Sequence, residues 1–281
     1  MKLARGMALM ALALVTLPAL TADWIAPAPY DRQFRDTILA APSRAHPLGT
    51  DDLGRDRLSR LLYGTRVSLV LAPAAALLAA LLSGAAGVFA AWKGGWWRSG
   101  VEVSSDLFLS LPWMFLLLTV RAALPLNLSP WTSVAVTFLL LGALGWAAPS
   151  RVVLTGARAL CDSDYLLLAR AQGCRGAALL FTHLLPNLRP VLLAQFWTSI
   201  PLFILTEANL SMLGLGVTEP LPSWGALLKE LEDVSAISRH PWILAPAILL
   251  FAVVSSLHVI LKFQDSGMTG ETACPTKEAT V

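Results

Sequence analysis

The chain has 281 residues, of which 56% are hydrophobic and only 14% charged, and its formal net charge at pH 7 is +3. Soluble domains carry about a quarter charged residues, so this composition excludes an ordinary globular protein. The small net charge and the lack of a basic run exclude a nucleic-acid-binding protein. Continuously apolar stretches of roughly 20 residues instead predict an all-α protein with several membrane-spanning helices.

Six apolar stretches are predicted to span the membrane. The first also resembles a secretory signal peptide, so it is either an uncleaved anchor or a cleaved leader. The second contains Ser83, Gly84 and Gly87, small residues that let a neighbouring helix approach closely. The predicted spans are residues 7–25, 67–92, 107–124, 133–148, 191–215 and 242–263.

These spans divide the chain into four regions. We expect an N-terminal transmembrane helix at residues 1–25, an outer segment at 26–66, a transmembrane core at 67–264 and a polar, disordered tail at 265–281. An inner loop at 149–190 lies within the core. An even number of spans places both ends of the chain on one side, and the Lys/Arg distribution slightly favours the inner side.

Polar side chains on and beside the fifth span are candidates to line a pathway or form a gate. A carboxylate in hydrocarbon is costly and normally faces a cavity or a partner, so Glu207 is the most informative of them. It either lines a pathway, packs at a gate, pairs with an arginine of the outer segment, or reaches the membrane interface. The same span is predicted to be interrupted at Pro201. The candidates are Gln195, Ser199, Glu207, Asn209 and Ser211.

The inner loop at 149–190 is too long and too polar for a tight connection, which is typical of a functional loop. Asp162 is predicted to cap a short amphipathic helix over residues 164–172, and Gly173 to end it. A second apolar stretch, residues 177–185, is predicted to end at Pro186. The short helix either docks into a groove on a partner or lies on the membrane surface.

The run of residues 165–173 resembles the "EAA" loop of bacterial ABC importer permeases. Gly173, Leu185 and Pro186 stand at the spacing of that motif, and Ala169 matches its second alanine. His183 stands at its apolar position, as is common in the peptide-importer branch.

Two positions of the motif differ, because Leu167 and Leu168 replace its Glu and its first Ala. Asp164 supplies the carboxylate that the peptide-importer branch usually carries before the tyrosine.

Two further stretches are similar to signatures of the C-type subunits of dipeptide, oligopeptide and nickel importers. One is residues 46–56, with its continuation at 62–69, and the other is residues 207–225. The charged cluster of the first stretch, which includes Asp52, is either an internally paired loop or part of a binding-protein contact. The signature residues are His46, Pro47, Gly49, Asp51, Gly54, Arg55 and Asp56.

This resemblance implies a type I ABC importer permease (MetI-like) fold in the bacterial inner membrane, with both ends of the chain in the cytoplasm. It implies a heterodimer with a second permease, two cytoplasmic ATPases that use ATP and Mg²⁺, and an outer solute-binding protein. It implies no cofactor and no metal on this chain. The expected cargo is a peptide, with nickel or another small solute as the alternative.

The resemblance also assigns the inner loop to coupling with the ATPases. Leu167, Leu168 and Ala169 would form an apolar docking face. Arg170 and Arg175 either meet carboxylates on the ATPase or face solvent or lipid headgroups, and His183 is either part of this contact or a packing residue. The implied coupling residues are Asp164, Tyr165, Leu167, Leu168, Ala169, Arg170, Ala171, Gly173, His183, Leu185 and Pro186.

Two other classes of protein fit the sequence less well. A membrane protease needs a base on one element and a nucleophile on another, whereas Ser255, Ser256 and His258 share one span. The sequence contains no Gly-x-Ser-x-Gly, His-Glu-x-x-His or Walker A motif, and its three cysteines lack metal-ligand spacing. An ion-coupled secondary transporter would show internal repeats and several intramembrane ionisable residues, which we do not find.

Overall fold

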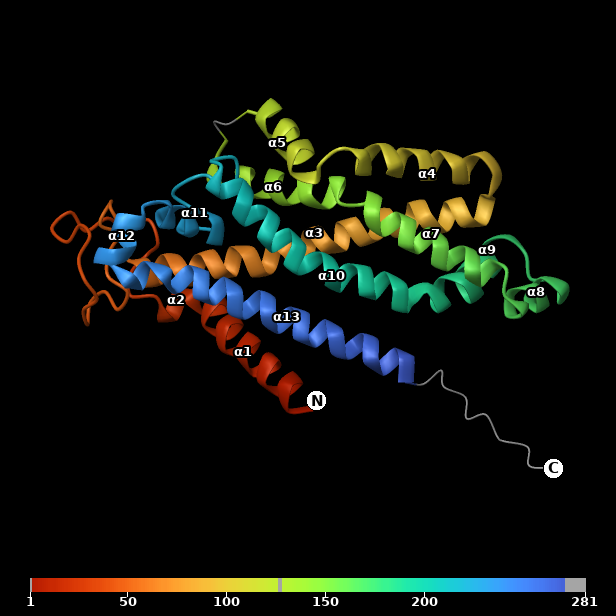
Figure 1. Ribbon diagram of the computed structural model, residues 1–281, viewed down its shortest axis with the longest axis horizontal. Helices are drawn as coiled ribbons and strands as arrows, with labels where there is room; N and C mark the ends of the chain where they lie inside the picture. The colour runs from red at the N-terminus through yellow and green to blue at the C-terminus, as the bar shows by residue number, and fades with distance from the viewer. Residues whose placement is uncertain (1, 126–127, 271–281) are drawn as a thin grey trace.

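The computed structural model describes residues 2–125 and 128–270, and this part of the chain is almost entirely helical. The helices run mainly along one long axis (Figure 1). Short 3-10 turns at Lys229–Glu232 and Pro241–Leu244 flank α12. The helices are α1 (Lys2–Leu20), α2 (Ala22–Ile25), α3 (Arg57–Lys93), α4 (Gly95–Ser110), α5 (Trp113–Ala123), α6 (Pro130–Leu144), α7 (Ala147–Cys161), α8 (Asp164–Ala171), α9 (Gly176–Ala178), the π-helix η1 (Leu179–Leu184), α10 (Leu185–Met212), α11 (Trp224–Leu228), α12 (Val234–Arg239) and α13 (Ala245–Gly270).

The described residues contain five helices long and apolar enough to cross a membrane, or six if the bent pair α4–α5 counts as one span. Lipid hydrocarbon offers no hydrogen-bond partners, and a helix pairs its backbone N–H and C=O groups with one another. The prediction of a helical membrane protein with about six spans is therefore confirmed.

The third span differs from the prediction of one helix over residues 107–124. The chain forms two helices there, α4 and α5, whose axes differ by 86°. The break falls at Leu111 and Pro112, both of which have extended ψ angles of 134° and 121°. Proline disfavours helical geometry in the residue before it and cannot donate a helical hydrogen bond, so the helix stops there.

Two other predicted boundaries are wrong. The second span begins not at residue 67 but at Arg57, because Asp56 caps α3 by accepting a hydrogen bond from the Ser59 backbone N–H at 2.7 Å. The helix α13 extends to Gly270, beyond the end of the candidate span at Lys262, so residues 265–270 of the predicted polar tail are helical. Residues 271–281 of that tail lie outside the described residues.

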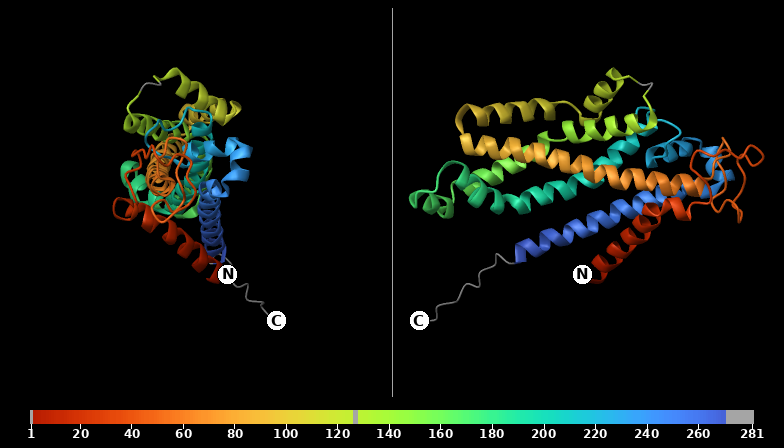
Figure 2. Two further views of the ribbon diagram at one scale, coloured as in Figure 1. Left: turned by 90° about the vertical axis from the view of Figure 1, so that its left-hand side faces the viewer. Right: turned by 180° about the vertical axis from the view of Figure 1, so that it is seen from behind.

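The fifth span is not interrupted. The helix α10 continues through Pro190 and Pro201 from Leu185 to Met212, and Pro186 lies in its first turn, where a missing N–H costs no helical bond. The stretch that precedes it therefore runs on into the span instead of ending at Pro186. The resulting helix connects two distant ends of the molecule. One end holds α8 and α9, and the other holds residues 26–56, α11 and α12 (Figures 1 and 2).

The long helix α3 is the centre of the bundle and packs against α6, α7 and α10. Small residues permit this, as the sequence predicts: Ser83 is fully buried, and a Cβ on Gly87 would meet the Ser150 carbonyl oxygen and the Leu154 nitrogen of α7 at 2.9 Å. A Cβ on Gly84 would lie 3.0 Å from a methyl group of Leu192 on α10. Backbones that approach this closely gain dispersion contacts that lipid does not provide.

We predict that Gly87→Leu destabilises the bundle by about 1–3 kcal/mol, because the added side chain meets the α7 backbone. The matched control is Gly100→Leu, since a Cβ at Gly100 meets no atom within 4 Å. Thermal unfolding in detergent is expected to show a melting temperature several degrees lower for Gly87→Leu alone. Equal melting temperatures would contradict the assigned α3–α7 contact.

Candidate functional site

The short helix predicted at residues 164–172 is present as α8, at one end of the molecule (Figure 1). Asp164 lies in its first turn, where a carboxylate is favourable to the helix dipole. The predicted cap Asp162 is wrong: Asp162 terminates α7, and Ser163 precedes α8. Gly173 follows the helix with a φ angle of +90°. Glycine adopts this angle without steric strain because it has no Cβ atom.

The helix α8 has one buried and one exposed face. Leu166 and Ala169, three residues apart, are 0% and 6% exposed and pack with Leu184 and Leu188. The predicted docking face is therefore wrong for Ala169, which faces the protein's own core.

The other face of α8 leaves apolar side chains uncovered. Tyr165, Leu167 and Leu168 are 51%, 48% and 61% exposed, and Arg170, Ala171 and Arg175 are exposed as well. Phe181, which the sequence analysis missed, adds a further exposed aromatic side chain at 64%. We call Tyr165, Leu167, Leu168 and Phe181 the α8 patch.

A contact between Tyr165 and His183 braces α8 against the segment that follows it. The Tyr165 hydroxyl lies 2.7 Å from His183 Nδ1, and the two rings meet edge to face with centroids 5.5 Å apart. His183 belongs to the π-helix η1, which passes directly into α10 at Leu185 and Pro186. Both residues belong to the motif match of the sequence analysis, and the structure places them in contact.

A cavity of about 500 Å³ lies where two helix junctions face the middle of α10. Its wall comes from the α4–α5 junction, the α6–α7 junction and the middle of α10. Of the predicted pathway residues, Gln195 and Ser199 line it, together with Thr198, which the sequence analysis missed. The rest of the wall is mainly apolar and includes Trp113 and Phe203. Irregular backbone at membrane depth is tolerated where it borders such a cavity.

The three remaining candidates of α10 do not line this cavity. Glu207 is fully buried and accepts a hydrogen bond from Ser211 at 2.7 Å, while its second carboxylate oxygen has no partner among the described residues. Ser211 also accepts a bond from the Val217 N–H at 3.3 Å. Asn209 is exposed. Among the alternatives for Glu207, this geometry fits packing beside the loop that follows α10, without an arginine partner.

The outer signature residues form an internally paired loop around the start of α3. His46 Nδ1 lies 2.9 Å from Asp56. Asp51 is fully buried and accepts bonds from the backbone N–H and the Nε of Arg55 at 2.7 and 2.6 Å. Gly54 has a φ angle of +74°, which closes the turn between them. Gly49 is buried, whereas Pro47 and Asp52 are exposed.

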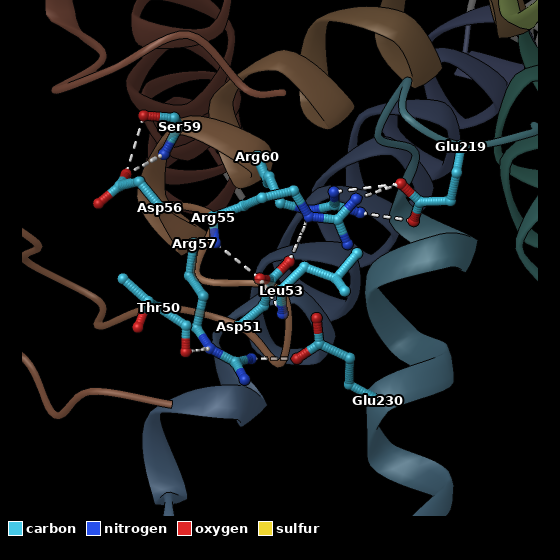
Figure 3. A network of polar contacts seen from close by, with 10 residues as sticks. All are labelled: Thr50, Asp51, Leu53, Arg55, Asp56, Arg57, Ser59, Arg60, Glu219 and Glu230. Carbon is cyan, nitrogen blue, oxygen red and sulfur yellow. Dashed lines mark hydrogen bonds and ion pairs between the residues drawn. The ribbon is translucent and has the colours of Figure 1, made fainter. Parts of the chain in front are cut away.

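Sequence analysis missed the partner that completes this loop. Glu219, in the segment between α10 and α11, accepts hydrogen bonds from Arg55 Nη1 at 2.5 Å and from Arg60 Nη2 and Nη1 at 2.8 and 3.2 Å (Figure 3). Arg60 Nε also lies 3.7 Å from Asp51. We call Asp51, Arg55, Arg60 and Glu219 the arginine clasp. Beside it, Arg57 pairs with Glu230 (Figure 3).

The arginines of the clasp lower the pKa of Glu219. Burial alone raises the pKa of Glu219, but hydrogen bonds and charge from Arg60 and Arg55 outweigh it and hold the pKa below its ordinary value of 4.5. Burial likewise raises the pKa of Glu230, and there the opposing effect of Arg57 is too weak to reverse it.

Comparison with known proteins decides the family. Residues 83–270 match the family described as the binding-protein-dependent transport system inner membrane component. The chain belongs to this family. The match covers α10 and the whole α8 segment, and it begins inside α3, after the clasp arginines.

Curated relatives are similar over most of the chain. It is 32% identical over 201 residues to the oligopeptide transport system permease protein OppC of Bacillus subtilis. The matched region covers 72% of this chain and 63% of that protein. It is 31% identical over 235 residues to the glutathione transport system permease protein GsiD of Pectobacterium atrosepticum, with 83% and 76% covered. For the di/tripeptide permease protein DppC of Pseudomonas aeruginosa, identity is 32% over 258 residues, with 88% and 81% covered.

We predict that the clasp stabilises the fold at neutral pH and loses this effect in acid. Because the folded-state pKa of Glu219 is lowered, its contribution is fully present above 4.5 and disappears as the pH falls through the folded-state pKa. Wild type should melt at a higher temperature than Glu219→Gln at pH 7, and the difference should shrink below pH 4.5.

The control for this prediction is Glu232→Gln, which removes an exposed carboxylate from the same end of the molecule. It should melt like wild type throughout. A difference between wild type and Glu219→Gln that is independent of pH would argue against an ionic clasp.

Proposed function

We propose that this chain is one permease subunit of an ATP-driven importer that takes up peptides. A second, homologous permease completes the pathway, two cytoplasmic ATPases bind ATP and Mg²⁺, and a solute-binding protein delivers the cargo from outside. The observation that carries the proposal is the combination of family membership with an exposed apolar α8 patch at one end of the bundle.

The α8 patch supports docking of an ATPase in preference to a resting place on the membrane. A membrane-surface helix buries its apolar face in lipid, whereas α8 turns Leu166 and Ala169 into the protein and braces Tyr165 on His183. An exposed apolar helix face is a typical anchor in a groove on a partner protein. Arg170 and Arg175 at its edge are suited to carboxylates of that partner.

The α8 end is then cytoplasmic, and the clasp end faces the solute-binding protein. The N-terminus and the end of α13 lie toward the cytoplasm in this arrangement, in a bacterial inner membrane. ATP binding moves α8, and the unbroken helix α10 conveys the movement to the other end of the bundle. A ligand can shift such an equilibrium only by binding one state more tightly than the other.

The cavity supports a peptide as cargo. Its wall presents the neutral polar side chains Gln195, Thr198 and Ser199 among apolar residues. Neutral hydrogen-bonding groups suit the amide backbone of a peptide, and apolar walls suit its side chains. The relatives named for oligopeptides, for di- and tripeptides and for glutathione agree with this class. Nickel or another small solute remains the second candidate, and direct assay distinguishes them.

The test is uptake by the complete importer in proteoliposomes. We expect accumulation of a labelled peptide that requires ATP inside the vesicle, where the ATPases bind, and binding protein outside. Uptake on an ion gradient alone, without ATP, would overturn the proposal.

Gly173 variants test the coupling role within the same assay. Gly173→Val is expected to abolish most ATP-driven uptake, because a β-branched residue is strained at a φ angle of +90° and α8 loses its position. Gly173→Asn should retain much more, since asparagine tolerates positive φ better. A Cβ there meets no atom of the described residues within 4 Å, so membrane insertion and folding of the bundle should be unchanged. Wild-type uptake by Gly173→Val would contradict the role.

A further inference from the structure

The arginine clasp has two sides of different character. Arg55 and Arg60 are held from behind by the rest of the protein, and their side chains are 7% and 1% exposed. Asp51 fixes the backbone and side chain of Arg55, and Arg60 lies in the first turn of α3. Donors that are already buried and oriented lose little entropy when they bind an acceptor.

Glu219 is the opposite kind of group. Its side chain is 54% exposed, and it stands on the irregular segment 213–223 between α10 and α11. Its carboxylate accepts hydrogen bonds from Arg55 and Arg60. Another carboxylate in the same place would receive the same bidentate fork.

We propose that Arg55 and Arg60 form a carboxylate-binding site at the clasp end, which Glu219 occupies in this structure and yields to a carboxylate arriving from outside the membrane. The site is preformed, because Arg55 and Arg60 are buried and keep their positions. Glu219, which leaves, lies on a surface segment. The proposal rests on the proposed function for the direction of arrival.

The charges make the exchange obligatory. Two guanidinium groups and Asp51 leave one positive charge when Glu219 departs, while the adjacent Arg57 is already paired with Glu230. An uncompensated buried charge is strongly unfavourable, and Arg60 Nε already lacks a hydrogen-bond partner among the described residues. Glu219 therefore leaves when another carboxylate replaces it, and arrival of that ligand frees the segment at the end of α10.

The ligand chemistry is a carboxylate, and two sources can supply it. One is the C-terminal carboxylate of the peptide cargo, and the other is an acidic side chain on the docking surface of the solute-binding protein. Both approach from the same side, and the experiment separates them.

The test measures binding to the complete importer in lipid nanodiscs, without ATP. The variant Glu219→Ala vacates the site, and Glu232→Ala is the matched control. The probes are trialanine, trialanine amide and the importer's own solute-binding protein in its ligand-free form. We expect one carboxylate probe to bind Glu219→Ala about tenfold more tightly than wild type, the scale of a charged hydrogen bond, with no change in Glu232→Ala.

The pattern identifies the source. Tighter binding of trialanine but not of its amide assigns the site to the peptide terminus, and tighter binding of the solute-binding protein alone assigns it to an acidic side chain. Glu219→Gln, which keeps hydrogen-bonding atoms in place but removes the charge, serves where the alanine variant unfolds. Wild-type affinity of the folded variants for all three probes would overturn the proposal.

The binding measurement does not require transport, because no ATP is present. A site that binds trialanine in an importer that never accumulates peptide would sink the function and leave the site. Normal ATP-driven uptake together with unchanged binding in both Glu219 variants would refute the site and leave the proposed function intact.

Discussion

Two buried arginines at the beginning of α3 require carboxylates, and the clasp end is assembled around that requirement. Asp51 and Glu219 come from segments far apart in sequence, and both reach Arg55 and Arg60. Removing one partner of a buried ion pair leaves an uncompensated charge, so separating the two segments is unfavourable. Trp224, fully buried, adds a bond from its indole N–H to Thr65 of α3 at 2.9 Å.

This arrangement gives α10 a defined partner at each end. At one end the π-helix η1 and the Tyr165–His183 contact join it to α8. At the other end the segment that follows it carries Glu219 to α3. A helix rises about 1.5 Å per residue, so an unbroken α10 spans the bilayer core as one rod. We therefore propose that a displacement of α8 is transmitted to the clasp, and reciprocity of coupling then predicts that a ligand at the clasp acts on α8.

Much of the architecture is encoded in local patterns. The apolar stretches predict the spans, the small residues of α3 predict its close contacts, and Gly173 predicts the end of α8, because these features depend on neighbouring residues in the chain. The family motifs at the α8 segment and at residues 46–56 are equally local. The roles of these residues in coupling remain proposals.

The features that could not be predicted from the sequence depend on contacts between residues that are distant along the chain. Glu219 is separated from Arg60 by 159 positions, and nothing in either neighbourhood indicates their pairing. The inward turn of Ala169 follows from how α8 packs on Leu184 and Leu188, which a motif does not encode. The break at Pro112 was readable in principle, since a proline lies inside the predicted span, but the apolar composition on both sides concealed it.

The central claim is that α10 connects the α8 patch to the clasp. Spin labels at Leu53 and Leu213, which are 45% and 59% exposed and lie on the two chain segments that the clasp joins, test this connection in an importer whose native cysteines are replaced. The distance between the labels should change when ATP is trapped in the ATPases, and Gly173→Val should suppress that change. A distance that is identical with and without trapped ATP would contradict the account.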